Sequence, residues 1–404
     1  MYSFESNQVA SEFVRSRVDV PAVTRSELIG NDMRLEVASY DLGEGKFTNS
    51  YDISFLSESG QPNIEISQGL ASVFERARED PSLRVVTGAG FFFLVDQVNA
   101  VPRQYALNLA LQDGQLHSFP VADRESVFVE KGRMSYERIE ALGALSLNGV
   151  ELSWSGALSE HDTDVRVFSN GSSVITHVRN DETGSMRVLD DSSRYTPEID
   201  DDYVDVGLIR REDGVFVGVT TSASGGVDIL THDVVLRAHE RYIHGEIPDM
   251  RVHTVGRIAL DGAVQGAISV GPMLDEKNFS LHPINNDKSL GSRPPFLEVP
   301  LARTVVYDTD DGHTHIRLFD GRPGSPIFPG VTPQQAVDLI GGKEVIAAGC
   351  FLDPGQTAKL AVKETDEVMS YGNTHYLQWP QLPGEKFVWT PQHGRQVASM
   401  ITLR

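Results

Sequence analysis

The chain has little cysteine and no long apolar run. Cys350 is the single cysteine in 404 residues, which excludes an intramolecular disulfide framework and agrees with a reducing compartment. No stretch approaches the roughly 18 apolar residues of a membrane-spanning helix, and residues 1–25 lack the continuous apolar segment of a secretory signal peptide. We therefore expect a soluble, cytoplasmic protein.

Positive charge is also scarce. The chain has 35 basic and 57 acidic side chains, a formal charge of −22. Such a field opposes nonspecific attraction to nucleic acid and to anionic membranes, so we expect neither as a partner. A phosphorylated substrate would have to be met by a local group of arginines.

Short β-type runs separated by Gly, Asn and Asp dominate the sequence, as in LEVASYDL, YDISFL and ALSLNGVELSW. Their spacing is typical of antiparallel sheet. Two helices are predicted, at Gly69–Glu79 and Thr332–Ile340; in the second, Thr332 can cap and Pro333 suits the first turn. We expect a mainly β fold with a few helices, of the α+β class.

Several motifs follow one another in an order that resembles a known family. The segments are GLASVFERAREDPSLRVVTGAGFFFL (69–94), FVGVTTSASGGVDILTHDVVLRAH (216–239), VQGAISVGPMLDE (264–276), PLARTVVYDTDDGHTHIRLFDGRPGS (300–325), GVTPQQAVDLI (330–340), KEVIAAGCFLDPG (343–355) and GRQVASMITL (394–403). In this order they resemble the phosphodiester glycosidase domain family. The resemblance implies a mixed-sheet domain over residues 35–404, with a β-rich insertion at about 150–300 and an N-terminal appendage at 1–34.

Two turns depart from the family's pattern. Gly88 stands where the family has Asn in an Asn-Gly-Gly-Phe-Phe turn, so an amide side chain is lost. The family's Asp-Gly-Gly-Gly-Ser-Thr loop is replaced by Asp353-Pro354-Gly355-Gln356-Thr357-Ala358, which keeps the aspartate but not the glycine run.

Cleavage of a sugar phosphodiester requires carboxyl groups for proton transfer or attack at the anomeric carbon, and cations for the phosphate. The resemblance makes Asp353 and Asp320 the catalytic candidates. Each has an alternative interpretation as a turn aspartate, since Asp-Gly and Asp-Pro are common turn signals.

The remaining candidates would bind substrate. They are Arg303, Arg322, Thr304, Gly355 and Thr357. Arg303 and Arg322 would orient the anionic group; the alternative interpretation of Arg303 is a structural arginine paired with a neighbouring acid.

His313 and His315 alternate with Thr314 and would share one face of a strand. Two imidazoles on one face suggest a metal site, but the exposed face of a hairpin explains the spacing equally well and no third ligand is evident. We predict neither a metal nor a cofactor.

The sequence thus predicts a hydrolase that cleaves a glycosyl phosphodiester or related sugar conjugate. The alternative is a noncatalytic binding or scaffold protein that keeps the fold, which the altered turns at Gly88 and Pro354 favour. The oligomeric state is not predicted.

Overall fold

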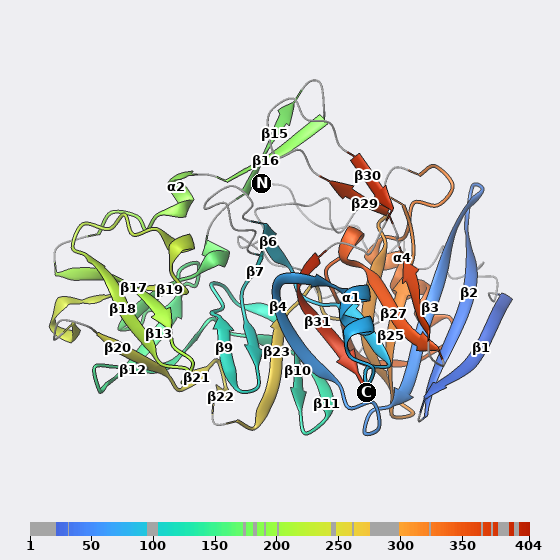
Figure 1. Cartoon of the computed structure of the whole chain (residues 1–404), viewed down its shortest axis with the longest axis horizontal. Coiled ribbons are helices and arrows are strands. Elements are labelled where there is room, and N and C mark those ends of the chain that lie inside the picture. The colour runs from blue at the N-terminus through green and yellow to red at the C-terminus, as the bar shows by residue number, and fades with distance from the viewer. Residues whose placement is uncertain are drawn as a thin grey trace, which may run out of the picture.

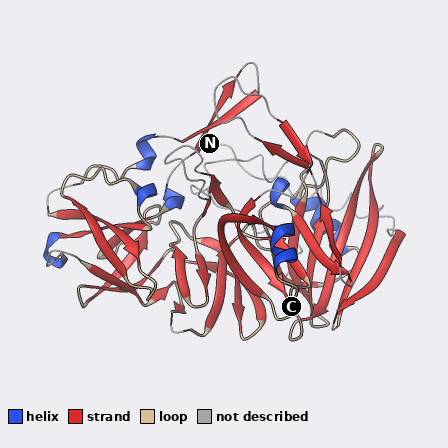
Figure 2. Cartoon of the chain, in the orientation of Figure 1, coloured by secondary structure: helices blue, strands red, loops and turns tan. Residues whose placement is uncertain are grey.

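A computed structural model describes most of the chain. The described residues are 22–30, 32–94, 104–172, 175–180, 184–189, 191–199, 202–243, 248–260, 262–274, 299–322, 325–364, 367–372, 375–378, 388–391 and 396–404. Strands dominate them (Figure 2), so the predicted mainly β fold is confirmed. No helix among these residues has the length and apolarity needed to cross a membrane.

The large sheet has six antiparallel strands in the order β1-β2-β3-β25-β24-β26. Its strands are β1 (Ala22–Gly30), β2 (Met33–Gly43), β3 (Lys46–Leu56), β24 (Arg303–Thr309), β25 (His313–Phe319) and β26 (Ile346–Phe351). Segments from both ends of the sequence therefore build one sheet. Strand β1, within the predicted appendage, forms its edge, and residues 1–21 lie outside the described part.

Two five-stranded sheets lie beside it. The terminal sheet has the order β28-β27-β5-β31-β4 and the middle sheet the order β11-β10-β23-β8-β9. The terminal strands are β4 (Asn63–Ser72), β5 (Val85–Gly88), β27 (Lys359–Glu364), β28 (Glu367–Gly372) and β31 (Gln396–Leu403). The middle strands are β8 (Ala110–Gln112), β9 (Gln115–Ser118), β10 (Arg124–Glu130), β11 (Arg133–Ile139) and β23 (Val264–Ser269).

Seven strands close into a barrel, in the order β12-β13-β14-β19-β17-β18-β20. They are β12 (Leu142–Leu147), β13 (Val150–Gly156), β14 (Val165–Phe168), β17 (Tyr203–Arg210), β18 (Phe216–Ser222), β19 (Val234–His239) and β20 (Asp249–Val252). Figure 1 shows the barrel at one end of the molecule, the large sheet at the other and the middle sheet between them.

Four two-stranded hairpins complete the strands of the described residues. Their members are β6 (Phe92–Leu94) and β7 (Gln104–Ala106), β15 (Ile175–Asn180) and β16 (Gly184–Leu189), β21 (Thr254–Val255) and β22 (Ile258–Ala259), and β29 (His375–Gln378) and β30 (Val388–Pro391).

The helices are short. They are α1 (Val73–Glu79), α2 (Asp191–Arg194), α4 (Pro333–Gly341) and the 3-10 turns η1 (Asn170–Ser172), η2 (Ile229–Thr231), η3 (Glu240–Tyr242) and η5 (Gly355–Thr357). Helix α4 confirms its prediction: Thr332 caps it, and the Gln335 side chain completes a capping box. Helix α1 begins at Val73, after its cap Ser72, and not at Gly69, because Gly69–Ser72 continue strand β4.

Apolar side chains from the large, terminal and middle sheets meet in one main core, to which Ile316, Ile401 and Val127 belong. The opposite face of the large sheet packs against α4 through a second core that includes Tyr307, Phe319 and Val337. The barrel has its own core. The large sheet therefore has two buried faces, which decide where its polar side chains point.

Candidate functional site

Three turns that are far apart in the sequence meet where β26 ends. The backbone N–H of Asp353 donates to the carbonyl of Ala89, at 2.9 Å. The N–H of Gly271 donates to the carbonyl of Phe351, at 2.7 Å. The glycine turn after β5, the Gly-Pro turn after β23 and the aspartate turn after β26 thus form one junction.

The junction is too tight for side chains at two of its glycines. A Cβ at Gly88 would lie 2.6 Å from the carbonyl oxygen of Thr357, and one at Gly90 would lie 2.7 Å from that of Ser269. Real Cβ atoms do not approach oxygen so closely. Gly88 is therefore required by the packing of this chain's own aspartate turn.

Asp353 is held by its own turn. Its carboxylate Oδ2 accepts a hydrogen bond from the Thr357 hydroxyl at 2.6 Å, and its side chain is nearly buried, with the residue 8% exposed. Gly355 has a φ of +76°, and its N–H donates to Ala302 at 2.8 Å. Gly355 and Thr357, predicted to bind substrate, thus fix the position of Asp353.

Asp320 follows the end of β25, at the same end of the large sheet. Its Oδ1 accepts the N–H of Gly321 at 2.7 Å. Burial raises the pKa of the Asp320 carboxyl to about 6, against the opposing effects of that N–H and the charge of Lys359. A carboxyl with such a pKa can hold a proton near neutrality and donate it to a leaving group.

Arg303 and Asp320 lie on opposite faces of the sheet, so they do not share a cleft. Arg303 is paired in register with Phe319, which belongs to the core on the α4 face. Asp320 follows the last residue of β25 and lies close enough to Tyr51 and Lys359 for their charges to interact. Tyr51 packs against the main core, on the other face of the sheet. The Arg303 guanidinium donates from Nε to the carbonyl of Val331 at 2.7 Å and from Nη2 to that of Val299 at 2.9 Å.

The environment of Arg303 fits a structural arginine. The residue is 3% exposed, and burial lowers the pKa of its guanidinium to about 9. Thr304 and Arg322, which were also predicted to bind substrate, have environments different from that of Arg303. Thr304 is fully buried on the main-core face, and its Oγ1 has no hydrogen-bond partner among the described residues. Arg322 is exposed in the turn after Asp320, where its N–H donates to Phe328 at 2.8 Å.

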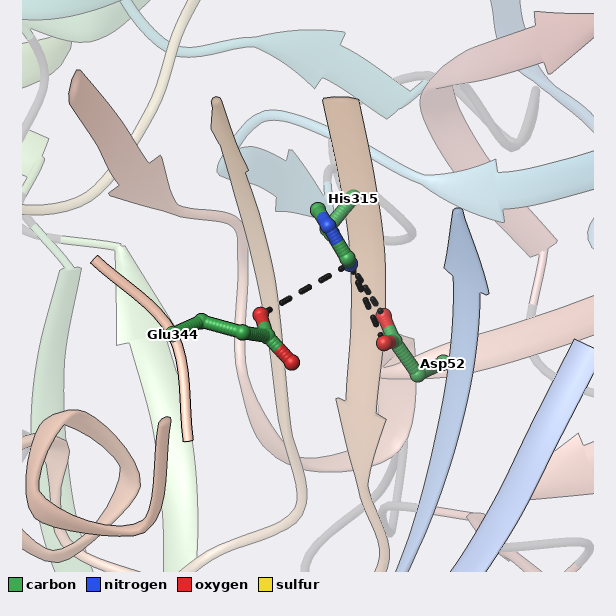
Figure 3. A group of neighbouring side chains, drawn as sticks. All are labelled: Asp52, His315 and Glu344. Atoms are coloured by element: carbon green, nitrogen blue, oxygen red, sulfur yellow. Dashed lines mark hydrogen bonds and ion pairs between the residues drawn. The ribbon is translucent and has the colours of Figure 1, made fainter. Parts of the chain in front are cut away.

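A second charged cluster lies on the α4 face of the same sheet. Asp52 of β3 lies 3.1 Å from Nδ1 of His315, and Glu344, after α4, lies 3.8 Å from it. Figure 3 shows the imidazole between the two carboxylates. Arg317 Nη2 joins both, at 2.5 Å from Asp52 and 2.7 Å from Glu344. The Tyr307 ring stacks on His315, with centroids 4.8 Å apart.

The charges of this cluster compensate one another. Burial acts to raise the pKa of Asp52, but the charges of Arg317 and His315 outweigh it and hold that pKa well below its usual range. Burial acts to lower the pKa of His315, but Asp52 raises it overall. The carboxylates could bind a metal by their geometry, yet the Arg317 guanidinium already occupies the cation's place. We interpret the cluster as structural.

His313 and His315 have different partners. His313 Nδ1 pairs with Asp311 at 3.1 Å in the turn before β25, whereas His315 pairs with Asp52 and Glu344. Among the described residues, the group with metal-binding geometry does not include His313. His313 and His315 therefore do not form a common ligand pair in that group, and the expectation of no metal stays a prediction.

Sequence analysis missed Asp52, Arg317 and Glu344. Arg317 is two residues after His315, so strand alternation puts both on one face, and this signal could have been used. No local signal connects Asp52 to them, because it comes from 263 positions earlier in the chain.

Comparison with known proteins shows the fold alone. No protein family and no curated protein match the chain. A solved "hypothetical protein from Synechocystis" is 13% identical, with a TM-score of 0.57, over 95% of this chain and 64% of that chain. A Burkholderia pseudomallei structure named "Putative exported protein" is 13% identical, with a TM-score of 0.51, over 88% and 74%.

A more distant likeness is to the zebrafish N-acetylglucosamine-1-phosphodiester alpha-N-acetylglucosaminidase catalytic domain auto-inhibited by pro-peptide. It is 10% identical, with a TM-score of 0.38, over 95% of this chain and 87% of that chain. The present chain spans less than two thirds of the Synechocystis protein's length.

Proposed function

We propose that the chain is a hydrolase that cleaves a glycosyl phosphodiester or a related sugar conjugate at the junction around Asp353. The observation that carries this proposal is the meeting of three separate turns at that residue, with Asp353 bonded to Ala89. Catalytic side chains commonly lie on turns that a rigid sheet holds in place. The sequence resemblance supports the same chemistry.

Two carboxyls at one end of the large sheet have different roles in the proposed reaction. Asp320, whose pKa is raised to about 6 by burial, is the general acid that protonates the leaving oxygen. Asp353, fixed by the Thr357 hydroxyl, is the nucleophile or base. A pair of carboxyls in different environments is the usual arrangement for cleaving glycosidic bonds.

Binding of the anionic part of the substrate is assigned to Arg322. Its side chain is exposed and follows Asp320 by two residues. Arg303 is assigned a different task, since its guanidinium joins the carbonyls of Val331 and Val299 on the other face of the sheet.

The second candidate function is that of a noncatalytic binding or scaffold protein. The use of Arg303 as a structural residue favours it, because a phosphate-binding arginine of the resembled family would then be lost. The replacement of a glycine run by Pro354 favours it as well, since proline restricts the loop beside Asp353.

Hydrolysis of a panel of aryl glycosides and sugar phosphodiesters tests the two candidates. We compare the unaltered protein with Asp353→Asn and Asp320→Asn, and with Asp310→Asn as the control. Asp310 is exposed in the turn at the opposite end of the β24–β25 hairpin. We expect kcat/KM to fall on the order of a hundredfold or more in the first two variants and to stay unchanged in the control.

Each variant is checked by thermal melting, so that loss of activity is separated from loss of folding. Equal turnover by all four proteins would overturn the assignment of the site. Binding of panel compounds without turnover would favour the second candidate.

A further inference from the structure

A pocket of about 350 Å³ lies on the outer face of the barrel, away from both clusters of the large sheet. Its lining includes Asp162, Asp164, Arg166, Phe168, Tyr203 and Arg237. The volume falls within the range of about 300–1,000 Å³ that is usual for small-molecule sites. No residue of the proposed hydrolytic site lines it.

Strand alternation explains why polar side chains gather there. Val165 and Val167 of β14, and Leu236 and Ala238 of β19, point into the barrel core. The residues between them therefore point outward, and Arg166 and Arg237 are paired in register across the two strands. The floor of the pocket is thus two arginines side by side on the outside of a closed sheet.

Both arginines are fixed before any ligand arrives. Arg237 donates two hydrogen bonds to the carboxylate of Asp205, from Nε at 2.8 Å and from Nη2 at 2.9 Å. Asp205 is fully buried. The Arg237 guanidinium also lies 5.3 Å from the Phe168 ring. Arg166 donates from Nη1 to the carbonyls of Gly156 and Ser159, at 3.1 and 2.8 Å. Such preorganisation reduces the entropy lost on binding.

The segment directly before β14 supplies acceptors to the lining. Oδ2 of Asp164 accepts from the backbone N–H and the hydroxyl of Ser153, at 2.9 and 2.6 Å, which fixes the carboxylate in the lining of the pocket. Asp162 lies beside it and is exposed. The Tyr203 ring, on a residue 42% exposed, adds an aromatic face that rests near His239, with ring centroids 5.7 Å apart.

The mixture of groups selects the chemistry of the ligand. A phosphate or carboxylate would be repelled by Asp162 and Asp164, and a polyamine by Arg166 and Arg237. Hydroxyl groups both donate and accept, so they satisfy carboxylates and guanidinium groups together. The apolar face of a sugar ring would in addition cover the Tyr203 ring.

We propose that this pocket binds a neutral carbohydrate and that the barrel is a second, noncatalytic ligand-binding unit. The proposal does not rest on the proposed hydrolase, because the pocket and the Asp353 junction share no residue. Sugar held there would be recognised by Tyr203 stacking and by hydroxyls bridging Asp164 and Arg166.

Saturation-transfer NMR on the full chain tests the proposal with glucose, N-acetylglucosamine, maltose and cellobiose as probes. Inorganic phosphate and spermidine, followed by calorimetry, test the anionic and cationic alternatives. The variants are Tyr203→Ala and Asp164→Asn. Tyr195→Ala is the matched control, since Tyr195 is 41% exposed and does not line the pocket; Asp353→Asn reports on the junction.

We expect at least one saccharide to bind the unaltered protein, Tyr195→Ala and Asp353→Asn, and its affinity to fall about tenfold or more in Tyr203→Ala and Asp164→Asn. Hydrolysis should be unaffected by these two substitutions, which separates this result from that of the proposed function. The proposal is overturned if no saccharide loses affinity in Tyr203→Ala, or if phosphate or spermidine binding is what that variant loses.

Discussion

The two faces of the large sheet hold buried carboxyls in opposite electrostatic situations. On the α4 face, Asp52 lies beside Arg317 and His315, and its pKa is held well below the usual range despite burial. On the other face, burial outweighs the backbone N–H of Gly321 and the charge of Lys359 and raises the pKa of Asp320 to about 6. Similar burial therefore lowers the pKa of one carboxyl, which has matched cations, and raises the pKa of the other.

The opposite pKa shifts of Asp52 and Asp320 indicate which of the two buried carboxyls is structural. A buried charge with a matched partner contributes to the arrangement of the fold and has little freedom to exchange a proton. A buried carboxyl whose ionised form is disfavoured is poised for acid catalysis, and such groups concentrate at functional sites. This criterion agrees with the placement of the proposed site on the Asp320 face.

The largest effect on stability is expected from breaking the compensated cluster. The Arg317 side chain is 2% exposed. Arg317→Met would therefore remove a buried cation and leave the carboxylates of Asp52 and Glu344 without it. We expect the free energy of unfolding to fall by about 3–5 kcal/mol, measured by urea denaturation. Arg211→Met, at a side chain 62% exposed, is the control and should change little; equal losses would contradict the structural interpretation.

The pH dependence of stability tests the uncompensated carboxyl. The folded-state pKa of Asp320, about 6, lies above the unfolded value of about 4, so the folded protein binds more protons between these values. Stability attributable to Asp320 is therefore lost as pH rises through this interval. Relative to Asp320→Asn, the unaltered protein should lose up to about 3 kcal/mol between pH 4 and 7. A constant difference between the two unfolding free energies would refute the raised pKa.

The tightness of the junction beside Asp353 is tested at Gly88. Gly88→Ala puts a Cβ 2.6 Å from the Thr357 carbonyl, so the aspartate turn must shift. We expect a loss of about 1–3 kcal/mol in unfolding free energy, together with reduced hydrolysis. Gly30→Ala is the control, because its new Cβ would meet only the Arg84 side chain at 3.7 Å. If both variants melt alike, the junction is looser than the geometry indicates.

The smallest effect is expected at Thr304. Its buried Oγ1 has no hydrogen-bond partner among the described residues, so Thr304→Val should leave stability unchanged or raise it by about 1 kcal/mol. Thr309→Val is the contrasting variant, because the Thr309 hydroxyl donates to Asp311 at 2.6 Å. A larger loss at Thr304 than at Thr309, measured by thermal melting, would show that Thr304 has a polar partner.

Local sequence signals predicted α4 because its capping residues and apolar face lie within ten positions of one another. They failed at the start of α1, where Gln396 and Val397 of β31 pair with Ser72 and Ala71. That pairing joins segments more than 300 residues apart, and it keeps the chain extended where local periodicity favours helix. Tertiary hydrogen bonding therefore overrode the local preference.

The sequence by itself determined the strand-rich class and the cap of α4, since each depends on residue types at short spacing. It offered Asp320 and Asp353 as candidates only through its resemblance to a known family. Only the tertiary structure decided which candidates belong together. The register of β24 and β25 put Arg303 on the α4 face, beside Phe319, and the return of the chain brought Asp353 to Ala89. Such pairings arise from contacts between distant segments, which the period-two pattern of an isolated strand does not encode.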